Sequence, residues 1–146
     1  MSVKNFFSLE EQQRIEQAIV EAEKLTSGEI RLHIDSRCPS SLEERTVQLF
    51  DKLGMQKTAL RNGVLFYLSI KDRLFAVIGD KGINDKVPAN FWDQIYANIR
   101  TEFAKENYCE GLCDAIRKAG EQLQQHFPIS ADDVNELDNE ISFSED

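Results

Sequence analysis

The residues best suited to chemistry lie in the stretch VIGDKGINDKVP, residues 77–88. Asp80, Asn84 and Asp85 offer side-chain oxygens within six positions, and Gly82 allows a backbone carbonyl to approach a bound group. Oxygen donors without sulfur or imidazole suit Ca²⁺ or Mg²⁺ rather than zinc or copper. This stretch is therefore a candidate cation-binding loop.

Two familiar loop motifs do not match, and a plain structural role stays open. An EF-hand loop has its glycine roughly five residues after the first aspartate, whereas Gly82 follows Asp80 by two. The glycine-lysine-hydroxyl sequence of a phosphate-binding loop is also missing. Spacing alone favours the structural role, in which Asn84 and Asp85 support the start of a helix at Pro88.

Hydrophobic periodicity predicts the elements that must position this loop. The capping box of Ser8 and Glu11 opens an amphipathic helix, and the alternating pattern of EIRLHID predicts a half-buried strand after it. The full expected order is helix, strand, helix, strand, strand, helix, helix, with the strands at residues 29–35, 62–70 and 73–79.

This order indicates one α/β domain over residues 1–128. We expect a three-layer α/β/α sandwich with four main helices, two on each sheet face, and a small mixed central sheet of about three or four strands. Residues 129–146 contain seven acidic side chains and no Lys or Arg, which predicts an acidic, flexible C-terminal tail.

The expected topology brings further oxygen ligands towards the candidate loop. The first two strands should run parallel because a helix connects them, and the hairpin should return the third strand antiparallel. Three loops, TSGE, RNG and GDKGIND, then meet at one rim of the sheet. The predicted metal ligands at this rim are Glu29, Asn62, Asp80, Asn84 and Asp85.

The opposite rim is a rival site, since ligands often bind at the carboxyl ends of parallel strands. Asp35, Ser36, Ser69 and Asp72 are expected there. The two aspartates could pair for acid-base work, but they fit a plain loop and a hairpin turn equally well.

Composition narrows the classes of partner. The formal net charge is −9, and removing the seven tail acids from the total of 26 leaves 19 acids against 17 bases. The acidic total argues against nucleic acid as a partner, and no stripe of basic residues in the sequence suggests one. We expect no membrane span and no signal peptide, a cytoplasmic location, and a monomer.

The three cysteines do not suggest a disulfide framework or a zinc site. Cys109 and Cys113 are expected to be small buried side chains, and Cys38 is expected in a loop.

Several stretches together resemble the TPM domain family. They are SGEIRLHIDS, LFDKLGMQKTALRNGVLFYLSIKDRLFAVIGDKGIND and FAKENYCEGL, which cover most of residues 8–126. The most specific parts are NGVLFYLSIKDR and the VIGDKGI that follows it. The resemblance implies an α/β/α sandwich with a small central sheet, and it implies a divalent cation, chiefly calcium.

Two functions follow from the resemblance and the loop. Some family members look like acid phosphatases of the photosynthetic lumen, and others are exported bacterial proteins or accessory proteins of membrane receptors. We expect a non-catalytic module that binds Ca²⁺, with Mg²⁺ as an alternative ion, at the five predicted ligands. The alternative is a metal-assisted phosphatase with Asp80 or Asp85 as base or nucleophile. A third possibility is a protein partner bound through the acidic tail.

Overall fold

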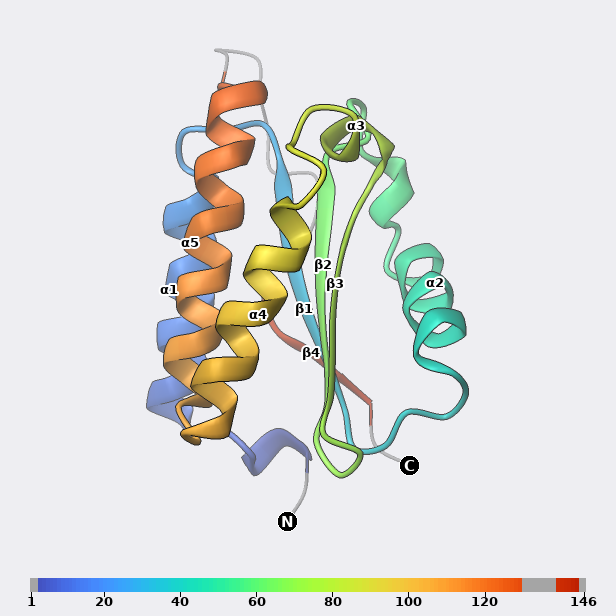
Figure 1. The fold of residues 1–146 in the computed structure, drawn as a ribbon, viewed down its shortest axis with the longest axis vertical. Coiled ribbons are helices and arrows are strands. Elements are labelled where there is room, and N and C mark those ends of the chain that lie inside the picture. Colours follow the sequence, from blue (N-terminus) through green and yellow to red (C-terminus); the bar gives the residue numbers. More distant parts are fainter. Residues whose placement is uncertain (1–2, 130–138, 145–146) are drawn as a thin grey trace.

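The computed structural model describes residues 3–129 and 139–144. Its sheet has four strands in the order β3-β2-β1-β4 (Figure 1). The strands are β1 (Glu29–Asp35), β2 (Gly63–Ser69), β3 (Leu74–Gly79) and β4 (Ser142–Ser144). The helices are α1 (Leu9–Glu23), α2 (Leu42–Lys52), α3 (Lys81–Asn84), α4 (Phe91–Ala104) and α5 (Tyr108–His126), with 3-10 turns η1 (Val3–Asn5) and η2 (Met55–Lys57).

The pairing of the three long strands is as predicted. β1 and β2 are parallel, from the pair Glu29 and Gly63 to the pair Asp35 and Ser69. β3 runs antiparallel to β2, because the hairpin after Ser69 turns the chain back. The apolar residues of β1 and β2 are fully buried, so these two strands form the centre of the domain.

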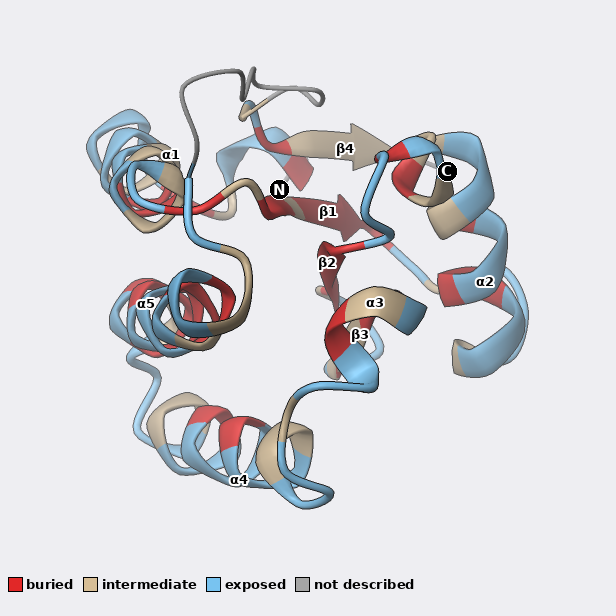
Figure 2. Ribbon diagram, turned by 90° about the horizontal axis from the view of Figure 1, so that it is seen from above, coloured by how far each residue is buried: buried red, intermediate tan, exposed pale blue. Residues whose placement is uncertain are grey.

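The expectation of two helices on each face is wrong. α1, α4 and α5 all cover one face, and α2 alone covers the other (Figure 2). The connection between α4 and α5 is short, so α5 folds back beside α4 and both stay on the same face. Gly120 of α5 lets this helix approach α1 closely, since a Cβ there would lie 2.6 Å from the Cβ of Ala22.

The sequence analysis did not predict β4. Ser142–Ser144 pair in parallel with residues 33–35 of β1, so part of the stretch expected as a tail belongs to the sheet. Most of the tail acids (Asp132, Asp133, Glu136, Asp138, Glu145 and Asp146) lie outside the described residues. Within residues 3–129 and 139–144, no helix combines the length and the apolar character needed to cross a lipid bilayer.

The candidate loop contains a short helix that the sequence analysis places in a turn. Asp80 is the N-cap of α3, and the long helix expected from Pro88 begins at Phe91 instead. Gly82 fits against the loop before β2, where its N–H donates to the carbonyl of Arg61 at 2.7 Å. A Cβ at Gly82 would lie 2.2 Å from the Leu60 carbonyl oxygen, so only glycine allows this approach.

Candidate functional site

The three predicted loops meet at one rim, where β1 and β2 begin and β3 ends. Glu29 pairs with Gly63 across the parallel strands, and the Asp80 N–H donates to the carbonyl of Gly63 at 2.8 Å. Glu29 and Asp80 therefore lie at the same rim, as predicted, on either side of the first residue of β2.

Asp80 uses its carboxylate within the protein. Its Oδ2 accepts from Arg61 Nε at 2.7 Å, and its Oδ1 accepts from Arg61 Nη2 at 2.9 Å and from the Lys81 N–H at 2.7 Å. This bidentate pair, with Asp80 only 6% exposed, fixes the loop before β2 to the start of α3. Asp80 therefore serves as a structural anchor in this arrangement.

Asn84 and Asp85 take different positions at the far end of α3. Asn84 Nδ2 donates to the carbonyl of Gly79 at 2.7 Å, and its Oδ1 accepts from Trp92 Nε1 at 2.8 Å. Asn84 thus ties α3 to the first turn of α4, which is the structural role that spacing alone favours. Asp85 is exposed and follows α3 as its C-cap.

Glu29 instead faces a second carboxyl group that the sequence analysis missed. Glu23, the last residue of α1, forms a hydrogen bond with Glu29, and its Oε2 accepts from the Ile30 N–H at 2.7 Å. Burial raises the pKa of Glu23, the Ile30 N–H lowers it and the charge of Glu29 raises it, and together these effects bring the pKa of Glu23 to about 8. The raised pKa favours the protonated form of Glu23 at neutral pH.

The sequence holds a weak signal for Glu23. A helix end favours cations, so an acidic last residue opposes the helix dipole. Such a residue is better explained by a partner outside the helix, and the TSGE turn returns the chain to that end of α1. The spacing of Glu23 and Glu29, across a turn, could have suggested this pair.

Asn62, whose backbone bonds to Glu29, leaves one buried side-chain oxygen without a hydrogen-bond partner. The backbone carbonyl of Asn62 accepts from the Glu29 N–H at 3.4 Å, and its side-chain Nδ2 donates to Ser27 Oγ at 3.3 Å. The side chain is only 1% exposed, yet its Oδ1 has no hydrogen-bond donor. A buried acceptor without a partner is unfavourable, so this oxygen is available to a ligand.

The described residues contain no ready-made metal cluster of the usual kind. Nowhere in residues 3–129 and 139–144 do three or more His, Cys, Asp or Glu side chains gather in a way that could hold an ion. The rim offers the carboxyl groups of Glu23 and Glu29 and the amide oxygen of Asn62. An ion bound there would take its remaining ligands from backbone carbonyls and water.

A buried polar network occupies the opposite rim. Asp35 accepts from Arg45 Nε at 2.7 Å, from Arg45 Nη2 at 2.9 Å, and from the Tyr67 hydroxyl at 2.6 Å. Burial raises the pKa of Asp35, but the hydrogen bonds from Arg45 and Tyr67 outweigh it and the net pKa is lowered. Asp72 accepts from the Cys38 N–H at 2.6 Å instead, so the two aspartates have separate partners and form no acid-base pair.

His33 connects this network to β4. Its Nδ1 lies 2.7 Å from Ser142 Oγ, and its Nε2 lies 2.9 Å from Asp35 Oδ1 and 3.1 Å from Ser144 Oγ. The imidazole is buried. Its contacts hold the short C-terminal strand against β1.

This connection predicts an acid-sensitive fold. Burial lowers the pKa of His33 despite the nearby Asp35 carboxylate, so the folded state keeps the imidazole neutral where the unfolded chain binds a proton. Stability is therefore full above the unfolded pKa and falls as the pH drops through about 6.5, by up to about 1.4 kcal/mol per pH unit. Urea unfolding between pH 8 and pH 5 measures this slope.

The matched variants for this prediction are His33→Asn and His126→Gln. The first should flatten the slope near pH 6, whereas the second, at the C-terminal end of α5, should retain it. An unchanged slope in His33→Asn would contradict the role of this imidazole.

The architecture is that of an α/β/α sandwich with a four-stranded mixed sheet and a polar rim at the amino ends of its parallel strands. The family model of the TPM domain matches residues 2–122. The chain belongs to the TPM domain family.

One solved structure of high sequence identity agrees with this assignment, and a second shows the same fold. The BA42 protein from the psychrophilic bacterium Bizionia argentinensis is 43% identical, with a TM-score of 0.88 over 95% of this chain and 96% of that chain. The N-terminal domain of a P. gingivalis protein is 19% identical, with a TM-score of 0.68 over 85% and 82% of the two chains.

The P. gingivalis structure and one more distant structure share only the fold with this chain. The N-terminal domain of cg2496 from Corynebacterium glutamicum is 13% identical, with a TM-score of 0.62 over 82% of this chain and 75% of that chain. No curated protein matches the sequence.

Proposed function

We propose that this TPM domain binds a divalent cation at the rim where β1 and β2 begin, and that it acts as a binding module. Glu23 and Glu29 supply the charged ligands, and Asn62 Oδ1 supplies a neutral one. The observation that carries this proposal is the pair of carboxyl groups of Glu23 and Glu29, together with a buried amide oxygen that lacks a donor on Asn62, whose backbone carbonyl bonds to Glu29.

The chemistry of these groups favours Ca²⁺, with Mg²⁺ as the second choice. Carboxylate and amide oxygens are hard ligands, and calcium tolerates an irregular shell completed by water, whereas magnesium requires a nearly octahedral one. An ion between Glu23 and Glu29 would replace the proton that Glu23 holds below pH 8, and above pH 8 it would relieve the repulsion between the two carboxylates. It would also tether the end of α1 to the start of β1 and stabilise the fold by mass action.

Of the other predicted ligands, Asp80, Asn84 and Asp85 lie outside this reduced set. Asp80 and Asn84 are engaged by Arg61 and Trp92, and Asp85 is exposed. A cation bound to Asp80 would have to displace a bidentate guanidinium, which is unfavourable.

Calorimetric titration with Ca²⁺ and then Mg²⁺ tests the proposal. We expect saturable binding that Glu29→Gln weakens by at least about tenfold, since calcium affinity depends on the number of charged ligands. Asp85→Asn is the matched control, because it removes an exposed carboxylate at the same rim and should bind like the parent. No heat and no thermal shift at millimolar ion, or equal losses in both variants, would end the proposal.

The phosphatase alternative remains a prediction without a specific structural observation in its favour. Hydrolysis of a chromogenic phosphomonoester, with Asp80→Asn and Asp85→Asn variants beside the parent, is the assay that tests it.

A further inference from the structure

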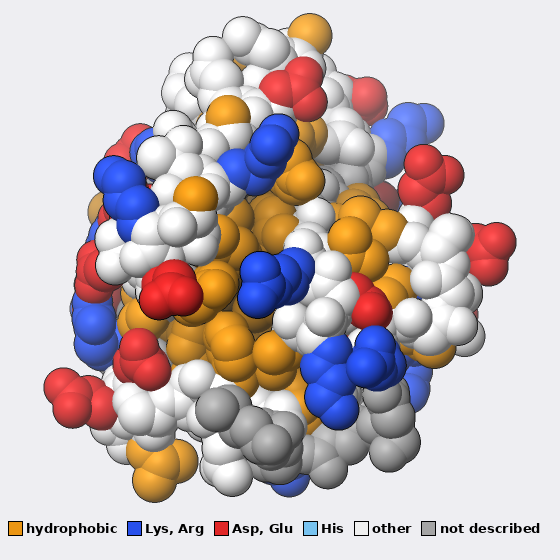
Figure 3. Space-filling model, turned by 60° about the horizontal axis from the view of Figure 1, so that its bottom comes forward, with side chains coloured by type: hydrophobic (Ala, Val, Ile, Leu, Met, Phe, Trp, Pro, Cys, Tyr) orange, Lys and Arg blue, Asp and Glu red, His pale blue; other side chains and the backbone are white. Residues whose placement is uncertain are grey.

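A large apolar hollow opens at the opposite rim, where β2 ends. It has a volume of about 560 Å³ and lies between the β2–β3 hairpin, the second half of α4 and the N-terminal segment. Figure 3 shows the hydrophobic side chains gathered on this face, with basic side chains among them. Small-molecule sites typically have volumes of roughly 300–1,000 Å³, so the hollow is large enough for one.

Aromatic rings that contact one another form its wall. The ring centroids are 5.8 Å apart for Phe75 and Phe103, 5.0 Å for Phe103 and Tyr108, and 5.2 Å for Tyr108 and Phe6. Tyr96 on α4 completes the wall and is 41% exposed. Contacts of this kind hold the rings in place, so the apolar surface exists before any ligand arrives.

Two arginines line the same hollow, and among the described residues no acidic side chain lines it. Arg100 lies over the ring of Tyr96, 5.9 Å from its centroid, and Arg73 stands in the hairpin turn. Among the residues that the structure describes, neither guanidinium forms a salt bridge with a carboxylate. A guanidinium can bind a carboxylate through two hydrogen bonds, so the hollow offers a docking point for an anion.

The backbone at Arg73 supports a role for its side chain. Arg73 has a φ of 54°, a left-handed conformation that glycine or asparagine adopts at lower cost. An arginine in this position carries a cost in backbone energy, which makes its side chain a candidate for a functional role.

From these observations we infer that the hollow binds a fatty acid. The carboxylate docks on Arg73 and Arg100, and the alkyl chain lies along the aromatic wall. Charge complementarity supports an anionic head, and the apolar wall supports an unbranched tail rather than a compact polar anion. The site is separate from the cation rim, since it lies at the carboxyl end of β2, the end of the parallel strands where ligands of open α/β sheets commonly bind.

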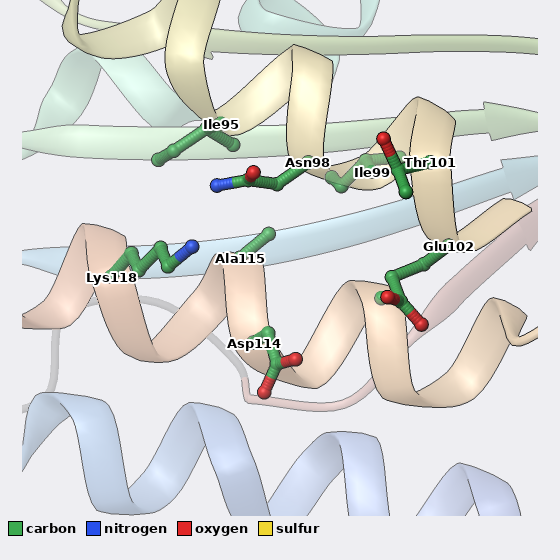
Figure 4. A pocket seen from close by; sticks show the side chains of 9 residues that line it. Ile95, Asn98, Ile99, Thr101, Glu102, Asp114, Ala115 and Lys118 are labelled. Atoms are coloured by element: carbon green, nitrogen blue, oxygen red, sulfur yellow. The ribbon is translucent and has the colours of Figure 1, made fainter.

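A second hollow, between α4 and α5, lacks this combination. It is smaller, about 180 Å³, and it is lined by Asn98, Glu102, Asp114 and Lys118 (Figure 4). Side chains of both charge signs face it, so it shows no preference for an anionic or an apolar ligand.

The inference is tested by calorimetric titration of the full chain with dodecanoate below its micelle concentration. We expect saturable binding of one molecule, weakened about tenfold by Arg100→Gln and about tenfold by Arg73→Asn, since hydrogen bonds to charged groups are worth that much. Asparagine suits the positive φ at residue 73, so this variant should fold normally. Ala104→Phe, which places a ring at the edge of the hollow, should also weaken binding.

Controls separate the site from other sources of affinity. Lys71→Gln, in the same hairpin but outside the hollow, and Arg117→Gln, which pairs with Asp114, should bind like the parent. Acetate and the neutral dodecyl maltoside should bind more weakly than dodecanoate. The inference is overturned by equal affinity in the Arg73→Asn/Arg100→Gln double variant, or by binding to phosphatidylglycerol vesicles without any binding of dodecanoate.

Discussion

Replacing Arg45 by methionine is expected to lower the free energy of unfolding by about 3–5 kcal/mol, the cost typical of breaking a buried ion pair from one side. The Arg45 guanidinium donates to both oxygens of Asp35, and both side chains are buried between α2 and β1. Methionine retains the apolar stem but leaves the carboxylate without its cation. Urea unfolding at pH 7 measures the loss.

The effect should depend on pH in a defined direction. The pKa of Asp35 is lowered in the folded protein, so its contribution is present above the unfolded pKa of about 4 and is lost as the pH falls further. Without Arg45 the folded pKa rises, and the carboxyl group can take up a proton in mild acid. The difference between the parent and Arg45→Met should therefore be largest near neutral pH and smaller near pH 4.

Two further variants make this prediction specific. Arg37→Met removes an exposed arginine that pairs with Asp72 at 3.5 Å, and it should cost less than about 1 kcal/mol. The double variant Asp35→Asn/Arg45→Met has no unpaired charge and should be more stable than Arg45→Met alone. If the free energy of unfolding lost in the double variant equals the sum of the losses in Asp35→Asn and Arg45→Met, the ion pair is not the cause.

The long elements of the fold follow from local patterns. Apolar alternation and unbroken apolar runs identify β1, β2 and β3 because these strands are seven, seven and six residues long and are covered by helices. β4 cannot be found in this way, since its three residues include two serines and are held by pairing with β1. The placement of three helices on one face also depends on packing, such as the contact of Gly120 with Ala22.

The sequence predicts which residues lie at the rim, but it does not predict which other residues they contact. Strand direction alone brings Glu29, Asn62 and Asp80 to one edge of the sheet. Which oxygens remain available depends on contacts across the fold, such as the guanidinium of Arg61 on Asp80. Sequence spacing cannot distinguish one oxygen-bearing side chain from another, whereas in the folded chain some of these oxygens already accept hydrogen bonds.

Cation binding at this rim should release a proton and become tighter as the pH rises. The pKa of Glu23 is raised to about 8 by burial and by Glu29, so below pH 8 an incoming ion must displace a proton. For one proton of this pKa, Ca²⁺ affinity should increase roughly 50-fold between pH 6 and pH 8 and level off above. Calorimetry at several pH values, in buffers of different ionisation enthalpy, measures both the affinity and the released proton.

The same raised pKa fixes how the ion-free protein responds to pH. A carboxyl group whose folded pKa exceeds its unfolded value contributes stability that is full below about 4.5 and is lost as the pH rises through about 8. Stabilisation by Ca²⁺ should therefore be greatest above pH 8, where the ion relieves the repulsion between Glu23 and Glu29. Glu23→Gln should weaken binding and remove most of its pH dependence, whereas Glu21→Gln, an exposed acid on the same helix, should change neither. A 50-fold dependence that persists in Glu23→Gln would place the displaced proton on another group, and the carboxyl pair would then not be the site that holds the ion.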